Sequence, residues 1–165
     1  MTNETQKANL KILLVEDQAG PLESLTIVIR EAILGETLQE RFTDTSEADM
    51  AQRGIDLARS YSSAEEFIKR NSYDLIFLDH RLPYEDQGDL ESKDFNTFAE
   101  TLDGRGYYLI PEIRQRNPVA AIIGTSSLSD YESRQLPRPD YRLDKCAEDI
   151  SENLEIIIQE IRRSK

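Results

Sequence analysis

The sequence predicts an α/β protein with a five-stranded, all-parallel sheet of strand order 2-1-3-4-5 and helices on both faces. Short apolar runs alternate with segments of helical periodicity along the whole chain. The runs are continuous rather than alternately polar, which is typical of strands buried on both faces. Such alternation implies right-handed crossovers and a doubly wound (βα)5 arrangement. A chain of 165 residues can build this as one domain.

The predicted strands are short apolar runs that end in polar residues. The third is the most informative, because four apolar residues run into Asp79 and Pro83 follows four residues later. A carboxylate at the mouth of a buried strand can be a metal ligand, a general base or a nucleophile that becomes an aspartyl phosphate, or it can only cap the next element. The strands are predicted at 11–15, 55–58, 73–78, 119–123 and 141–144.

The first two helices are predicted from apolar periodicity and from residues that suit helix starts. Pro21 suits the first position of a helix that runs to about Leu34. A capping-box pattern is expected to open the second helix. It consists of Ser62 and Ser63 followed by Glu65 and Glu66, with Ala64, Phe67 and Ile68 facing the core.

The later helices differ in the strength of their pattern. The third begins near Gly106, and Pro111 is tolerated only if it lies in the first turn. The fourth, about 129–135, is short and poor in apolar residues. The last has the clearest three- and four-residue periodicity. Its apolar positions are Ile150, Leu154, Ile157, Ile158 and Ile161.

Three segments do not fit the alternation of strands and helices. Residues 1–9 are polar and are expected to form a disordered tail before a single domain at 10–165. Residues 84–105 form an insertion with seven acidic and two basic side chains, placed to overhang the strand ends. Residues 35–53 form another, partly helical and partly mobile, because its apolar residues are too sparse for a core helix. These are Leu38, Phe42 and Met50.

Composition narrows the function. The net charge of −12 disfavours nucleic acid and anionic membranes as partners. Cys146 is the only cysteine, so an internal disulfide is excluded, and His80 is the only histidine, which excludes histidine-based triads and zinc hydrolase sites. No apolar segment has the length of a signal core or a membrane span. We therefore expect a cytoplasmic protein.

Chemically suitable residues follow four of the strands. The carboxyl ends of parallel strands lie at one edge of a sheet, where α/β proteins place their ligands. Three carboxylates held together there repel one another, and a hard cation such as Mg²⁺ relieves this repulsion. Asp79 could then attack a phosphorus atom while a hydroxyl and an ammonium group hold the phosphoryl oxygens. The residues are Glu16, Asp17, Asp79, Thr125, Ser126 and Lys145.

Each of these residues also has a structural interpretation. The carboxylates after the first strand could form a solvated strand end. Thr125 or Ser126 could cap the following helix, and Lys145 could offset nearby acids without touching a ligand. Their occurrence at successive strand ends favours the functional interpretation.

These residues resemble the receiver domain of two-component response regulators, over about residues 10–163. The resemblance implies a flavodoxin-like fold. Four motifs carry it: an opening strand with an acidic pair, a strand with the phosphoacceptor and a following proline, a strand ending in a hydroxyl and a small residue, and a strand ending in lysine. They lie at 11–18, 75–83, 122–126 and 143–145.

The resemblance implies a role for each site residue. Asp79 would accept a phosphoryl group from the phosphohistidine of a histidine kinase or phosphotransfer protein. Thr125 would bond that group and move on activation, and Lys145 would pair with Asp79 or its phosphoryl group. The implied Mg²⁺ ligands are Asp17 directly, Glu16 through water, Asp79, and the backbone carbonyl of Arg81.

The chain departs from the family pattern at several positions. A proline usually follows the lysine, and Cys146 stands there. The aromatic switch residue usually lies three positions before the lysine, where this chain has Arg142, with Tyr141 one position earlier. Arg81 and Ser127 border the site at positions where the family tunes the lifetime of the phosphorylated state.

Three functions remain open on the sequence. The leading one is a stand-alone phosphoacceptor signalling domain, which is not itself an enzyme and acts through an unknown protein partner or through a homodimer formed on phosphorylation. The second is a receiver-like binding module that is not phosphorylated. The third is a phosphohydrolase like the haloacid-dehalogenase superfamily, but its usual second aspartate is replaced by Arg81.

Overall fold

The computed structural model describes residues 10–36, 46–85, 105–145 and 147–164. Its five parallel strands form one sheet in the predicted order, β2-β1-β3-β4-β5. The predicted fold class and topology are therefore confirmed. The strands are β1 (Ile12–Val15), β2 (Ile55–Ala58), β3 (Leu75–Leu78), β4 (Ala121–Gly124) and β5 (Tyr141–Arg142).

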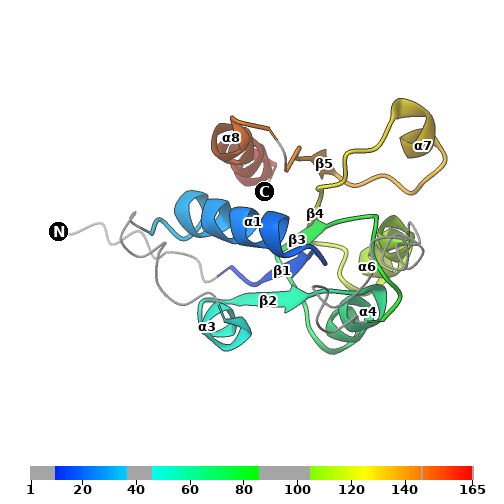
Figure 1. Cartoon of the computed structure of the whole chain (residues 1–165), viewed down its shortest axis with the longest axis horizontal. Helices are drawn as coiled ribbons and strands as arrows, with labels where there is room; N and C mark the ends of the chain where they lie inside the picture. Colours follow the sequence, from blue (N-terminus) through cyan, green and yellow to red (C-terminus); the bar gives the residue numbers. More distant parts are fainter. Residues whose placement is uncertain (1–9, 37–45, 86–104, 146, 165) are drawn as a thin grey trace.

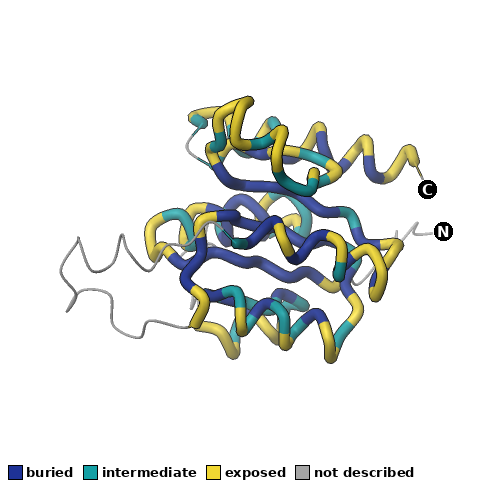
Figure 2. Tube along the Cα trace, turned by 90° about the vertical axis from the view of Figure 1, so that its right-hand side faces the viewer, coloured by how far each residue is buried: buried dark blue, intermediate teal, exposed yellow. Residues whose placement is uncertain are grey.

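Helices cover both faces of the sheet (Figure 1). The helices α1 (Ala19–Ala32) and α8 (Ile150–Arg163) pack on one face, and α4 (Tyr61–Arg70) and α6 (Ile110–Arg116) on the other. The central strands form a buried layer between them (Figure 2). Alternate strand residues supply two separate cores, which is why the strands are apolar throughout.

Residues 46–54 fold as part of the domain. The helix α3 (Glu47–Gln52) is capped by the side chain of Ser46, which accepts a hydrogen bond from the amide of Asp49. Met50 is fully buried in the core on the α1 side. The segment is partly helical as predicted, but Met50 does serve the core, because this one apolar residue is enough to anchor the short helix α3. Leu38 and Phe42 lie outside the described residues, as does the tail 1–9.

Two helix starts differ from the predictions. The α4 capping box uses Ser60 and Ser63, whose side chains each accept the other's backbone amide. The box predicted around Ser62 was therefore displaced by two residues, because Ser60 ends the loop after β2. The helix α1 begins at Ala19, so Pro21 lies in its first turn rather than at its first position. Ala64 and Ile68 are buried as predicted, and Phe67 is partly buried.

The remaining helices agree with the sequence pattern more closely. A 3₁₀ turn, η2 (Gly106–Leu109), leads into α6, and Pro111 lies in the first turn of α6 as predicted. The short helix α7 (Asp130–Arg134) is capped by Ser129 and has no buried residue. It lies away from the body of the domain in Figure 1. None of the helices in the described segments is long and apolar enough to cross a bilayer.

A buried ion network joins α1 to α3. Arg30 is completely buried, and its guanidinium pairs with Glu36, which also pairs with Arg53. Arg53 in turn pairs with Asp49 at 3.2 Å. Because every charge in the network has a partner of opposite sign, the desolvation of Arg30 is offset. The network lies beside the start of β2, at the sheet edge opposite the predicted site.

Gly106 is a position where the chain requires the absence of a side chain. A Cβ atom there would overlap the backbone carbonyl of Asp79, whereas a Cβ on Gly20 would meet nothing within 4 Å. We therefore expect Gly106→Ala to lower the free energy of unfolding by about 2–4 kcal/mol in urea denaturation. Gly20→Ala, in α1, is the control and should leave it unchanged or raise it by up to about 1 kcal/mol. Equal stability of the two variants would contradict this packing.

Candidate functional site

The site lies at the carboxyl ends of the central strands. The residue after each strand still belongs to the backbone ladder, so the first functional side chain at each strand end is held in place. These residues are Glu16 after β1, Asp79 after β3 and Thr125 after β4. Their amides donate to the carbonyls of Ala58 at 3.0 Å, Val15 at 3.2 Å and Leu78 at 3.0 Å, respectively.

Three carboxylates and one ammonium group meet at this edge. Glu16, Asp17 and Asp79 are buried, and one oxygen from each lies within 4.8 Å of the others. Lys145 places its Nζ 2.6 Å from Glu16 Oε2 and 3.1 Å from Asp79 Oδ2. The structure therefore brings these four residues together as the sequence predicted.

The electrostatics reflect an excess of negative charge. Burial, with the neighbouring charge of Asp79, raises the pKa of Glu16 to about 7. The same causes raise the pKa of Asp17. Burial opposes the charge on Lys145, but the carboxylates of Asp79 and Glu16 outweigh it, and the pKa of Lys145 is raised. One ammonium group thus faces three buried acids and cannot neutralise them all.

The residues fit a divalent cation with hard oxygen ligands. Both side-chain oxygens of Asp17 are buried and have no hydrogen-bond partner among the described residues. A buried acceptor without a donor is costly, and a cation would satisfy it. Three carboxylates without sulfur or imidazole ligands suit Mg²⁺ rather than zinc. The carbonyl of Arg81 as a further ligand stays a prediction.

The two hydroxyls after β4 have different surroundings. Thr125 is fully buried, and its hydroxyl has no hydrogen-bond partner among the described residues. Ser126 donates a hydrogen bond to Asp79 Oδ1 and accepts one from the amide of His80 at 2.6 Å. Neither residue caps α7, because Ser129 does so. The structural alternative for these two hydroxyls was therefore wrong.

His80 and Tyr107 also belong to the surroundings of the site, and no pattern in the sequence predicts this. The Nδ1 atom of His80 accepts a hydrogen bond from the amide of Tyr107 at 3.1 Å, and the two rings lie 5.0 Å apart. Burial lowers the pKa of His80, so the ring is neutral. The carbonyl of His80 accepts the amides of Arg105 and Gly106. This loop therefore closes tightly behind Asp79.

The positions that depart from the family pattern are now placed. Arg142 is exposed and its guanidinium reaches the carbonyl of Leu128 at 3.4 Å, while Tyr141 packs against the core on the α1 and α8 side. The side chain of Arg81 is also exposed and pairs with Glu132 of α7 at 3.3 Å. Cys146 lies outside the described residues.

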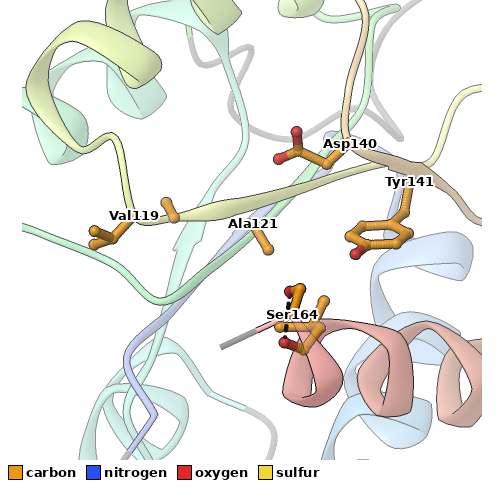
Figure 3. A pocket seen from close by; sticks show the side chains of 7 residues that line it. Val119, Ala121, Asp140, Tyr141 and Ser164 are labelled. Carbon is orange, nitrogen blue, oxygen red and sulfur yellow. Dashed lines mark hydrogen bonds between the residues drawn. The ribbon is translucent and has the colours of Figure 1, made fainter.

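A second hollow, at the other end of β4, offers no comparable chemistry. It measures about 700 Å³ and is bordered by Val119, Ala121, Tyr141 and the last turn of α8 (Figure 3). Its one carboxylate, Asp140, is already engaged, since it accepts the amide of Ile122 at 2.9 Å and pairs with Arg114 at 3.0 Å. The candidate site is therefore the cluster around Asp79.

Solved structures with the same fold are receiver domains. The chain is similar to the receiver domain of the sensor histidine kinase PA1611 from Pseudomonas aeruginosa PAO1, a structure with magnesium coordinated in its active-site cleft, at 22% identity and a TM-score of 0.60 over 93% of this chain and 97% of that one. A two-component response regulator from Clostridium difficile matches at 23% identity and a TM-score of 0.59, covering 93% and 96%. The Francisella response regulator 1452 receiver domain matches at 20% identity and a TM-score of 0.53, over 94% of this chain and 99% of that one.

These similarities establish the receiver fold for this chain. No protein-family model matches the sequence, and no curated protein matches it. The roles of the site residues therefore depend on the geometry described above.

The raised pKa of Glu16 has a consequence for stability. The metal-free folded state binds a proton at Glu16 more tightly than the unfolded chain, whose carboxyl titrates near its usual pKa of 4.5. Stability from this group is fully present below that value and is lost as pH rises towards about 7. We expect the free energy of unfolding of the wild type, relative to Glu16→Gln, to fall by on the order of 1–3 kcal/mol between about pH 5 and pH 8.

Urea denaturation in the presence of a chelator measures this difference. At about pH 8, adding Mg²⁺ should restore the stability that the wild type loses relative to Glu16→Gln, because a bound cation stabilises the ionised carboxylates. A stability difference that does not change with pH would contradict the electrostatics proposed for Glu16.

Proposed function

We propose that this chain is a phosphoacceptor signalling domain in which Asp79 takes a phosphoryl group from a histidine kinase or phosphotransfer protein. The observation that carries the proposal is the cluster of three buried carboxylates with Lys145 at the carboxyl ends of the sheet. A purely structural role does not account for it, because two oxygens of Asp17 and the hydroxyl of Thr125 are buried without partners among the described residues.

The chemistry is a transfer between a nitrogen and an oxygen. An oxygen of the Asp79 carboxylate attacks the phosphorus atom of a phosphohistidine, and the P–O bond forms as the P–N bond breaks. The electron pair of the broken bond stays on the imidazole nitrogen, which takes a proton from solvent. The product is an aspartyl phosphate, in which a group of about two negative charges replaces the single charge of the Asp79 carboxylate, a net gain of about one. This change of charge is the signal.

The neighbouring residues have distinct tasks in this reaction. Mg²⁺, held by Asp17, Glu16 and Asp79, would offset the negative charge of the transferring group when bound. Lys145 already contacts Asp79 Oδ2 and is placed to pair with a phosphoryl oxygen. The free hydroxyl of Thr125 supplies a hydrogen-bond donor for another such oxygen.

The partners follow from the reaction and the charge. A phosphohistidine donor means a histidine kinase or phosphotransfer protein, which places the reaction in the cytoplasm, and the output is a contact with another protein or a second copy of this chain. The net charge of −12 argues against nucleic acid and anionic lipid. A phosphohydrolase is disfavoured, because Arg81 stands at the position of the second aspartate and its side chain is exposed and paired with Glu132.

Phosphorylation of Asp79 can be measured directly. With Mg²⁺ and acetyl phosphate, intact-protein mass spectrometry should show a gain of one phosphoryl group that is lost in Asp79→Asn and retained in Asp130→Asn, whose carboxylate is exposed on α7. Chelation of Mg²⁺ should lower the rate at least about tenfold. No mass gain in the wild type, or a gain that survives Asp79→Asn, would rule the proposal out and favour the binding module. Repeated turnover of a phosphate ester would instead favour a phosphohydrolase.

Replacing Thr125 tests whether its hydroxyl, which has no partner among the described residues, forms a hydrogen bond to the phosphoryl group. In Thr125→Val the buried hydroxyl is lost without breaking a bond, so the free energy of unfolding should stay equal or rise by about 1 kcal/mol. The affinity for beryllofluoride with Mg²⁺, followed by ¹⁹F NMR, should fall about tenfold.

Thr26→Val is the matched control, since Thr26 is equally buried but its hydroxyl donates to the carbonyl of Leu22 at 2.7 Å. We expect it to lower stability by about 1 kcal/mol and to leave beryllofluoride binding unchanged. Unaltered binding in Thr125→Val would show that Thr125 has no part in holding the phosphoryl group.

A further inference from the structure

Ser126 restrains the carboxylate of Asp79. Because Ser126 Oγ accepts the His80 amide at 2.6 Å, its own proton is directed to Asp79 Oδ1. Lys145 binds the other oxygen, Oδ2, at 3.1 Å. The carboxylate therefore has a donor on each oxygen, and these two contacts fix its orientation.

The backbone around Ser126 also contacts a buried aromatic residue. Tyr107 is almost fully buried, and its hydroxyl lies so close to Gly124 that a Cβ on this glycine would overlap it. The hydroxyl has no hydrogen-bond partner among the described residues. Burial raises the pKa of Tyr107, and the nearby backbone amide of Ser126 acts in the opposite direction. The amide of Tyr107 is held by His80. Tyr107 thus touches both strand ends that carry Asp79 and Ser126.

Tyr107 lies on the opposite face of the sheet from Tyr141, the aromatic residue of β5. Tyr141 packs into the core beside α1 and α8, whereas Tyr107 belongs to the core beside α4 and α6. Arg142 is exposed and binds the carbonyl of Leu128. The described aromatic residue in contact with the end of β4 at Gly124 is therefore Tyr107, which comes from the segment before α6.

We propose that Ser126 is a positioning residue that holds Asp79 in its unphosphorylated state, and that the segment 125–126 couples the state of Asp79 to Tyr107. The proposal rests on the function proposed above. An ionised carboxylate is a strong acceptor, and the hydrogen bond from Ser126 is charge-assisted. In an aspartyl phosphate the carboxyl group is part of a mixed anhydride, and its oxygens accept hydrogen bonds more weakly. The restraint is then weakened, the segment moves, and the unpartnered hydroxyl of Tyr107 changes its surroundings.

The sign of the effect follows from this difference. A hydrogen bond that is stronger before phosphorylation stabilises the unphosphorylated state and opposes conversion. Removal of the Ser126 hydroxyl should therefore favour the phosphorylated state, whereas removal of the adjacent Thr125 hydroxyl should disfavour it. A purely structural role for Ser126 does not predict opposite signs for the two neighbours.

The coupling can be tested by NMR on the full chain labelled with ¹³C. Without Mg²⁺ or phosphodonor, Ser126→Ala should shift both the Cγ resonance of Asp79 and the ring resonances of Tyr107, and Ser62→Ala, at an exposed position on α4, should shift neither. Asp79→Asn and Tyr107→Phe assign the two signals. A shift at Asp79 alone would overturn the coupling, and no shift at either would overturn the restraint.

A second measurement tests the sign. Ser126→Ala should bind beryllofluoride with Mg²⁺ about threefold to tenfold more tightly than the wild type. A hydrogen bond to a charged acceptor is about 1 kcal/mol stronger than one to a neutral acceptor, and this difference corresponds to that change in affinity. Unchanged or weaker binding would overturn the proposal. If Ser126→Ala does not fold, Tyr107→Phe provides the reciprocal test, because a coupled pair requires the Cγ resonance of Asp79 to shift.

Failure of the proposed function gives a different result. If Asp79 is not a phosphoacceptor, the wild type gains no phosphoryl group and does not bind beryllofluoride, while the resonance shifts in the phosphate-free protein still report on Ser126. The two failures are therefore distinguishable.

Discussion

The repulsion among three buried carboxylates is the constraint on which this structure depends. Glu16, Asp17 and Asp79 are held within reach of a single cation, and Lys145 offsets only part of their charge. The raised pKa of Glu16 is the direct result. Such an arrangement lowers the stability of the metal-free protein, and under the proposed function the same excess charge would draw a cation and prepare Asp79 as a nucleophile.

The rest of the fold holds these charges in place. The strand register sets Val15 beside Leu78 and Leu78 beside Gly124. The residues that come directly after these strands therefore lie next to one another. Two apolar cores clamp the strands from both faces. Gly106 lies against the carbonyl of Asp79 and lets the loop pack directly behind the site. A carboxylate held by rigid backbone cannot move away from its neighbours to relieve the repulsion.

Sequence reasoning reached the fold and the clustered residues because both follow from the strands. The continuous run from Leu75 to Leu78 identifies a buried strand, and strand order then places Asp79 beside Glu16. It did not reach the burial of Arg30, because nothing local shows that Glu36 and Arg53 turn back to meet it. It placed Ser126 at the site but did not reach its hydrogen bond to Asp79, which lies 47 positions away and depends on the register of β3 and β4.

The aromatic contact at the end of β4 comes from a different segment than the resemblance to receiver domains implies. Two segments border the end of β4, namely the neighbouring strand β5 and the segment before α6. Here Arg142 is exposed and hydrogen-bonded to the loop before α7, and Tyr107 contacts the strand end at Gly124. If the proposed coupling holds, the change at Asp79 would reach η2 and α6 rather than β5. Its partner surface is then expected beside the exposed Tyr108, which follows Tyr107 in η2.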